Sequence, residues 1–269
     1  MLANVVKEEW KSIIGRVAFL NCDPLFFGLD PQWKVLPAPP SWLTGHLLRR
    51  DCVLAPIPAA DYARHAEELV LVPEIGICSK GEVGSVLVFG DVPLKEMNTI
   101  ALPTDSQTSV ALLRYILAQE GMNPDTTLMG PDLTTMLDSC DGALLIGDRA
   151  LEGAKAHPER VQLDLGDAWM KRTSKPMVFG VFAARRDTPV EDVKRAQMAL
   201  LHRLDLFENN LEVRESVIEW SMSRSDLNHD RLDRYFGEVF NRLDGEHIEG
   251  LEEFLVEACN LENGSSFAW

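Results

Sequence analysis

Short apolar runs, each broken by polar turn residues, recur along the chain and predict buried strands. The first run, residues 17–20, passes directly into Asn21, Asp23 and Pro24, which favour turns and loops. Six further runs of strand length lie at residues 51–58, 69–72, 86–89, 99–102, 143–146 and 178–184. The run at 86–89 is apolar throughout, which is typical of a strand buried on both faces and therefore favours a parallel sheet.

Segments with helical spacing fill the intervals between these runs. Ser41 can cap a short helix that carries Leu43, and Gly121 lies just past a helix predicted at 110–119. Further helices are predicted at residues 132–137, 190–208, 211–222, 232–243 and 248–259. Short strands that alternate with helices predict an α/β protein with mostly parallel strands.

The order of the strands predicts two lobes joined by two crossings of the chain. Lobe one would combine residues 1–90 with the helical tail 182–269, and lobe two would be the middle of the chain, residues 91–181. Neither a Pro/Gly/Ser-rich linker nor an internal repeat separates the two. A cleft between the lobes is then the expected place for a ligand.

Composition and net charge limit the kinds of partner that this protein can bind. The chain of 269 residues is 46% hydrophobic and 25% charged, as is ordinary for a soluble globular protein. Its 26 Lys and Arg against 42 Asp and Glu give a net charge of −16, which argues against a nucleic-acid partner. Because this charge repels anions at long range, a pocket for an anion must be locally positive or rich in N–H donors. No apolar run approaches the roughly 18 residues of a membrane span, so we expect no membrane partner.

The cysteines and histidines suggest neither a metal nor a cofactor. The five cysteines are scattered and lack C-x-x-C spacing, and the six histidines lack metal-ligand spacing. There is no G-x-G-x-x-G, P-loop or G-x-S-x-G motif. The first residues do not resemble a signal peptide. We therefore expect a reduced, cytoplasmic protein.

Four stretches could carry chemistry, and each also has a purely structural interpretation. Asn21 can reach a ligand beyond a strand end or stabilise its own turn. The turn 81–85 ends at Ser85, and its glycines allow close approach of the backbone or form an ordinary hairpin. Residues 105–109 precede the helix predicted at 110–119, where hydroxyl and N–H groups can bind anions, or Ser106 or Thr108 can simply cap the helix. Asp148 follows a buried strand and can cap a helix or reach the cleft.

Together these stretches resemble a known family, the menaquinone-pathway chorismate dehydratases. The resemblance is in order along the chain between about Gly15 and Arg186. The segments that carry it are RVAFLNCDPL at 16–25, GEVGSV at 81–86, SQTSV at 106–110, LIGD at 145–148, DLGDAW at 164–169 and PMVFGVFA at 176–183. The chain departs from the family at Thr173-Ser174-Lys175-Pro176, where Thr-Gly-x-Pro is expected, which puts this local turn in doubt.

The resemblance implies a two-lobed, periplasmic-binding-protein-like type II fold with the active site in the cleft. It implies removal of water from chorismate to give 3-[(1-carboxyvinyl)oxy]benzoate in the futalosine route to menaquinone. The family's active-site asparagine and serine carry over to Asn21 and Ser85. We expect further substrate contacts from hydrogen-bond donors at the start of the predicted helix, from one residue in the turn 81–85 and from one residue after the strand at 143–146. These residues are Ser106, Thr108, Ser109, Gly84 and Asp148. A homodimer is a further expectation.

The matched turns contain no histidine or lysine, which suggests a substrate-assisted mechanism. Our hypothesis is that the enolpyruvyl carboxylate of chorismate removes the C3 proton while Asn21 and Ser85 orient it. Glu82 or Asp148 as a conventional base is the alternative. Cys22 is not expected to act as a nucleophile. The rival functions are a non-catalytic binding protein for a small anion and the sister futalosine-pathway enzyme that forms dihydroxynaphthoate.

Overall fold

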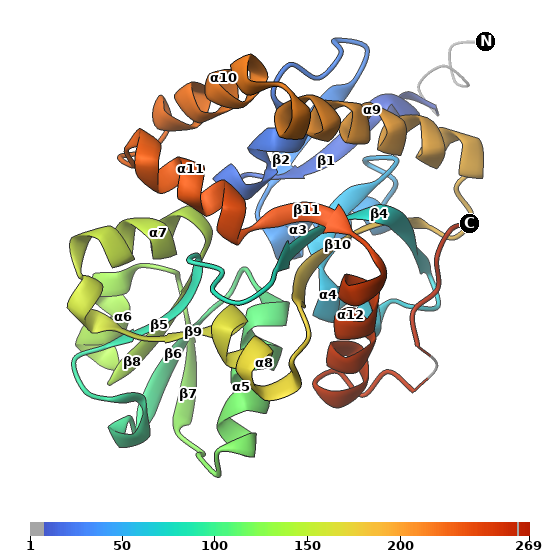
Figure 1. Ribbon diagram of the computed structural model, residues 1–269. Coiled ribbons are helices and arrows are strands. Elements are labelled where there is room, and N and C mark those ends of the chain that lie inside the picture. Colours follow the sequence, from blue (N-terminus) through green and yellow to red (C-terminus); the bar gives the residue numbers. More distant parts are fainter. Residues whose placement is uncertain (1–7, 263) are drawn as a thin grey trace.

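A four-stranded sheet and a pair of strands form the upper part of the structure in Figure 1, a computed structural model that describes residues 8–262 and 264–269. The four-stranded sheet has the order β11-β4-β10-β3. Its strands are β3 (Ala55–Pro58), β4 (Leu69–Ser79), β10 (Met177–Arg185) and β11 (Phe240–Leu243), all paired antiparallel. The separate pair, β1 (Ile13–Val17) and β2 (Lys34–Ala38), is parallel. The Gly15 N–H donates to the Leu54 carbonyl at 2.9 Å and ties β1 to the start of β3.

A five-stranded sheet of order β7-β6-β8-β5-β9 forms the lower part of Figure 1. Its strands are β5 (Val86–Gly90), β6 (Thr99–Pro103), β7 (Asp125–Met129), β8 (Gly142–Ile146) and β9 (Val161–Asp164). β6 is parallel to β7 and β8, but β5 is antiparallel to both of its neighbours. The prediction of mostly parallel strands was therefore wrong. Because β5 is buried on both faces, both sides of the sheet must be covered. This burial does not determine whether the strand runs parallel or antiparallel to its neighbours.

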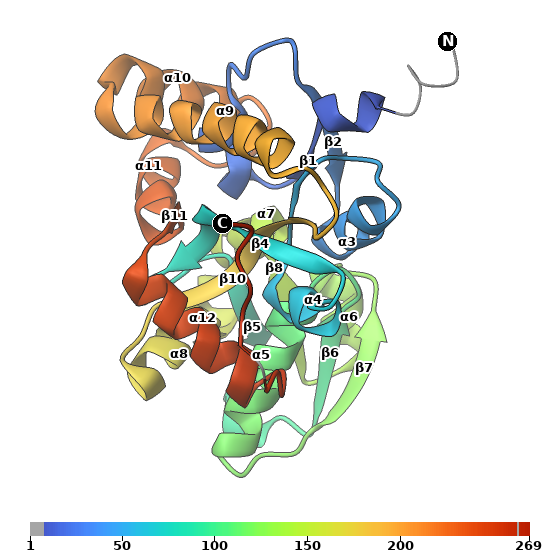
Figure 2. The ribbon, with the colours of Figure 1, turned by 90° about the vertical axis from the view of Figure 1, so that its right-hand side faces the viewer.

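Helices cover both faces of the two sheets. α6 (Leu133–Ser139) and α7 (Gly147–Ala156) pack on one face of the five-stranded sheet with Leu87 and Phe89, and α5 (Gln107–Gln119) and α8 (Leu165–Thr173) lie on the other (Figure 1). α4 (Ala59–Arg64) and α12 (Gly245–Glu257) pack on β10 (Figure 2). The remaining helices are α2 (Asp23–Phe26), α3 (Pro40–Leu48), α9 (Val190–Asn209), α10 (Leu211–Met222) and α11 (His229–Glu238), with the 3-10 turns η1 (Glu9–Ser12), η2 (Leu20–Cys22), η3 (Leu94–Glu96) and η4 (Pro158–Arg160).

The first predicted strand lies earlier than its apolar run suggested. β1 ends at Val17, and the run continues into η2 because Phe19 and Leu20 are buried as part of a turn rather than a strand. Asn21 lies inside η2, the 3-10 turn that immediately precedes α2. The expected cap at Ser41 was also wrong: Pro39 is the N-cap residue of α3, and the buried Ser41 hydroxyl has no hydrogen-bond partner among the described residues.

The C-terminal tail contains a strand, β11, in a region where the sequence pattern predicted only helix. The helix predicted at 232–243 ends at Glu238, and the next residues form β11 against β4. The Asn241 side chain is buried and donates to the Gly76 carbonyl at 3.1 Å, a contact that a continuous helix could not make.

The chain passes between the two sheets twice, once from β4 to β5 and once from α8 to β10. β5 belongs to the five-stranded sheet and β10 to the four-stranded sheet. No helix among residues 8–262 and 264–269 is long and apolar enough to cross a membrane. Residues 1–7, on which the signal-peptide prediction partly depends, lie outside the described residues.

Candidate functional site

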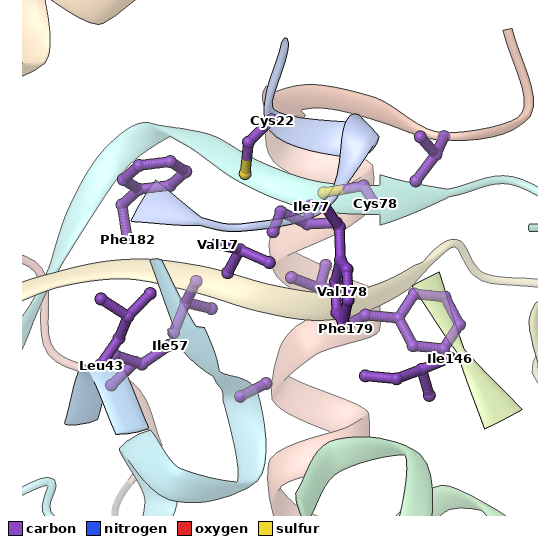
Figure 3. Close-up of a cluster of buried hydrophobic side chains, with 14 of the residues drawn as sticks. Val17, Cys22, Leu43, Ile57, Ile77, Cys78, Ile146, Val178, Phe179 and Phe182 are labelled. Atoms are coloured by element: carbon purple, nitrogen blue, oxygen red, sulfur yellow. The ribbon is translucent and has the colours of Figure 1, made fainter. Parts of the chain in front are cut away.

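A pocket of about 520 Å³, counting its open mouth, lies where the two sheets approach each other. Five of its lining residues are apolar side chains from five different strands, namely Val17, Ile57, Ile77, Ile146 and Phe179. Figure 3 shows the same five side chains within a cluster of buried hydrophobic residues. The other lining residues are Phe19, Asn21, Pro40, Pro56, Pro58, Val83, Ser85, Val86, Ser106, Ser109, Gly147, Gly180 and Val239. The polar side chains of the wall are therefore one amide and three hydroxyls.

Asn21 presents a buried amide with an unused acceptor at this wall. The side chain is 9% exposed, and its Oδ1 atom has no hydrogen-bond partner among residues 8–262 and 264–269. Leaving a buried acceptor unpaired costs about 1–3 kcal/mol, so such atoms need an explanation. η2 holds Asn21 in place because the Leu20 N–H beside it donates to Asp148 Oδ1 at 3.0 Å. The arrangement suits a side chain whose partner is a ligand.

Ser85 reaches the pocket from the residue just before β5. The hydroxyl is 3% exposed, and Tyr235 of α11 donates to its Oγ atom at 3.1 Å. The backbone carbonyl of Ser85 accepts from the Gly147 N–H at 2.8 Å, which joins the turn before β5 to the start of α7. Tyr235 itself was missed from the sequence, because it lies 150 residues away in a segment interpreted only as amphipathic helix.

The start of α5 supplies two more hydroxyls. Ser106 is the N-cap residue: its Oγ accepts from the Ser109 N–H at 3.4 Å, as expected. The Ser106 hydroxyl also donates to Ser109 Oγ at 2.8 Å, which leaves the Ser109 proton free to point into the pocket. Both serines line the pocket, so capping and a role at the wall coexist. Thr108 instead accepts from the Ala60 N–H at 3.1 Å and joins α5 to α4.

Gly84 supports Ser85 from behind. Its φ of +65° lies in the left-handed region, and its N–H donates to Asp164 Oδ2 at 2.8 Å. A Cβ atom at Gly84 would lie 2.3 Å from Oε2 of Glu238 and 2.6 Å from the Arg231 guanidinium, so α11 closes over this turn. Gly84 is not among the residues that line the pocket.

The two alternative bases lie outside the pocket wall. Glu82 is exposed, and neither Glu82 nor Asp148 is among the lining residues. Asp148 is in the first turn of α7 and does not cap it; its carboxylate instead accepts the Leu20 N–H. Burial raises the pKa of Asp148 to about 6, with the nearby Asp23 charge adding to the effect.

The wall contains no Lys, Arg or His. The Arg149 guanidinium lies 5.6 Å from the ring centre of Phe19, but it forms an ion pair with Asp105 at 2.8 Å. Asp105 retains one buried carboxylate oxygen without a partner. Of the two kinds of anion pocket that the net charge allowed, locally positive or rich in neutral donors, the lining residues match the second.

Cys22 is enclosed next to Asn21. Its side chain is fully buried, and burial raises the pKa of its thiol to about 12. The neighbouring Asp23 carboxylate is also fully buried, where Arg16, Arg224 and Ser221 bind it. A protonated thiol in these surroundings is a weak nucleophile. No group of three or more His, Cys, Asp or Glu side chains among the described residues is placed to hold a metal ion.

The raised pKa of Asp148 predicts a pH-dependent stability effect. Since the folded pKa is about 6 and the ordinary value is 3.8, the folded state binds this proton more tightly. Asp148 therefore contributes most favourably below about pH 4, and this contribution is lost as the pH rises through about 6. Asp148→Asn, which keeps an acceptor for Leu20, should raise the free energy of unfolding at pH 7.5 by about 1–3 kcal/mol.

Urea unfolding of both proteins at pH 4 and pH 7.5 tests this expectation. The difference between variant and wild type should be largest at pH 7.5 and should shrink at pH 4. An equal difference at both pH values would show that Asp148 does not titrate between them.

Comparison with solved structures defines the class of protein. The alkanesulfonate-binding protein SsuA from Xanthomonas axonopodis pv. citri matches with a TM-score of 0.65 at 15% identity, over 92% of this chain and 93% of that one. A Candida albicans protein described as having the generic periplasmic binding protein fold gives a TM-score of 0.65 at 14% identity, over 94% and 91%. Protein AF1704 from Archaeoglobus fulgidus gives 0.72 at 18% identity, over 91% and 96%. The chain thus has a periplasmic-binding-protein-like fold, which confirms the prediction.

Sequence comparison then identifies the family. Residues 13–259 match the family model for menaquinone biosynthesis. A chorismate dehydratase from Thermus thermophilus is 33% identical over 213 residues, which cover 71% of this chain and 78% of that protein. The chain belongs to the menaquinone biosynthesis family, as the resemblance of its segments indicated.

Proposed function

We propose that this protein is a carbon–oxygen lyase that removes water from chorismate to give 3-[(1-carboxyvinyl)oxy]benzoate. The observation that carries the proposal is the unpaired, buried Oδ1 of Asn21 at the wall of a small pocket. The pocket combines this amide and the hydroxyls of Ser85, Ser106 and Ser109 with apolar side chains. Such a site suits a carboxylate-bearing ring: neutral donors bind the carboxylates, and the apolar side chains accommodate the ring.

The chemistry requires little acid–base machinery from the protein. The C3–H bond breaks as its electron pair enters the ring, the C4–O bond breaks, and hydroxide leaves with a proton as water. Aromatisation of the ring supplies the driving force. We propose that the enolpyruvyl carboxylate of the substrate takes the C3 proton. Positioning of one reactive conformer is then the main task of the wall, and it can contribute several orders of magnitude in rate.

Each polar group of the wall has a role in this proposal. The Asn21 amide N–H and the Ser85 hydroxyl would orient the enolpyruvyl carboxylate, and Asn21 Oδ1 would accept from the C4 hydroxyl of the substrate. Ser109 at the start of α5 would donate to the ring carboxylate, aided by the helix dipole, and Ser106 would orient the Ser109 hydroxyl by donating to it. Thr108, Gly84 and Asp148 would support these residues through the contacts to Ala60, Asp164 and Leu20.

The pocket is proposed to be the cleft between two lobes. Lobe one would hold residues 1–90 and 182–269, and lobe two residues 91–181. The sheets support a division of this kind, with boundaries shifted so that β5 joins lobe two and β10 joins lobe one. Five cysteines without disulfides support a reducing, cytoplasmic location. A homodimer stays a prediction.

Loss of the diene absorbance of chorismate on incubation with the purified protein tests the function. We expect the absorbance to disappear and mass spectrometry to find a product that has lost one water. Binding of chorismate without turnover would indicate the rival binding protein. Formation of dihydroxynaphthoate from the cyclic futalosine product would indicate the sister enzyme. Unchanged chorismate after long incubation at high protein concentration would contradict the proposal.

A further inference from the structure

Tyr235 is a fully buried tyrosine whose hydroxyl contacts the pocket through a single side chain. It lies on α11, and its hydroxyl is 3.1 Å from Ser85 Oγ. The ring packs against Phe236 with centroids 5.8 Å apart, and the Arg231 guanidinium lies 5.7 Å from the ring centre. The Tyr235 hydroxyl has no second hydrogen-bond partner among the described residues. Its ring is therefore fixed, and its proton has one acceptor available.

The direction of this hydrogen bond follows from its surroundings. If Ser85 donated to Tyr235, the phenol proton would be buried without an acceptor, which is costly. If Tyr235 donates, the Ser85 proton can point toward the pocket that Ser85 lines. Burial also raises the pKa of Tyr235, so the phenol keeps its proton at physiological pH. Donation from Tyr235 to Ser85 is the arrangement that leaves no buried proton unpaired.

We propose that Tyr235 is a positioning residue that fixes the Ser85 hydroxyl as a hydrogen-bond donor to a substrate carboxylate. Tyr235 occupies one lone pair of Ser85 Oγ, so the serine proton is directed away from the tyrosine. A hydroxyl that accepts one hydrogen bond also donates a stronger one, because the two bonds polarise each other. The inference rests on the proposed function, in which Ser85 contacts the enolpyruvyl carboxylate.

The position of α11 explains how so distant a residue can control Ser85. The ion pair between Arg231 and Glu238, at 2.9 Å, brackets Tyr235 on the same helix. Both charged groups lie against Gly84, where a Cβ atom would collide with them. The turn before β5 and the tyrosine are therefore held together by contacts on both sides of Ser85. The helical tail takes part in the site through this contact.

A double-mutant cycle separates this role from a merely structural one. Tyr235→Phe removes the hydroxyl but keeps the ring, and we expect kcat/KM for chorismate to fall about tenfold. In the Ser85→Ala background the same substitution should change kcat/KM by less than about twofold, since its target is gone. Tyr62→Phe is the matched control: Tyr62 is also fully buried, and its hydroxyl accepts the Ser266 N–H at 2.8 Å outside the pocket. It should leave kcat/KM unchanged.

The outcomes distinguish the inference from the function on which it rests. An equal loss in both backgrounds, or no loss in the Tyr235→Phe single variant, would overturn the role of Tyr235. A wild-type protein that binds chorismate without consuming it would contradict the proposed function alone. In that case, dissociation constants for chorismate, measured for the same four proteins of the double-mutant cycle, would still decide whether Tyr235 acts through Ser85. A wild-type protein that neither binds nor consumes chorismate would overturn both.

Discussion

Asn21→Ala should lower kcat for chorismate by about 10²–10³-fold and leave the free energy of unfolding unchanged or slightly higher. The expected loss of rate is that of a positioned polar group that contacts the reacting substrate. The stability expectation is unusual for a buried asparagine. It arises because Asn21 Oδ1 has no partner in the part of the chain that the structure describes, so the substitution removes an unpaired buried acceptor. Steady-state kinetics and urea unfolding measure the two quantities.

Asn210→Ala provides the matched control. Asn210 is the N-cap residue of α10, and its Oδ1 accepts from the Val213 N–H at 3.1 Å. Its replacement should lower stability by about 1 kcal/mol and leave kcat unchanged, the reverse of Asn21→Ala. If Asn21→Ala and Ser85→Ala kept normal turnover while Asp148→Asn abolished it, Asp148 would be the base and the substrate-assisted mechanism would be wrong.

Gly147→Ala should both destabilise the protein and damage the site. Gly147 has a φ of +61°, and a Cβ atom there would lie 2.7 Å from the ring of Phe19. Both residues line the pocket. The left-handed backbone costs alanine about 1–2 kcal/mol, and displacement of a packed ring adds about 1–3 kcal/mol. We expect kcat/KM to fall at least about tenfold, because the displaced ring changes the shape of the wall.

Gly121→Ala isolates the backbone part of this effect. Gly121 has a φ of +69°, lies just past α5 and has no atom within 4 Å of its would-be Cβ. It should lose only about 1 kcal/mol of stability, with kcat/KM unchanged. Thermal unfolding and kinetics of the two variants, side by side, test the comparison. Equal stability losses with normal activity in both would mean that Phe19 moves aside without consequence for the pocket.

Strands and helices could be predicted where the local pattern of apolar residues directly reflects their burial. β8 and β10 lie within a residue or two of their apolar runs because both of their faces are covered. α5 begins after Ser106, one of the two residues expected to cap it, and ends just before Gly121. Strand direction and the identity of β11 depend on pairing partners far away in the chain. β11 pairs with β4 across more than 150 residues, and a four-residue segment gives no local sign of that partner.

The site was predictable at the level of segments but not of side-chain direction. Asn21, Ser85, Ser106 and Ser109 line the pocket. Thr108 and Asp148 instead accept from backbone N–H groups, and the Gly84 N–H donates to the Asp164 carboxylate. A polar residue at the end of a strand or the start of a helix can point either way, and only the packing around it decides. Tyr235 was invisible to this reasoning because its relevance depends on α11 folding over the turn before β5.

The absence of lysine, arginine and histidine from the pocket wall has a consequence for discrimination among metabolites. A wall of neutral donors gives little electrostatic attraction, so an anion is retained only if its oxygens meet those donors in the right places. Abundant phosphorylated compounds carry high charge but lack that match, and they would lose their hydration for too few hydrogen bonds. If the pocket has the proposed function, it would therefore select by the placement of its donors what a cationic pocket would select by charge, and phosphate esters would compete poorly.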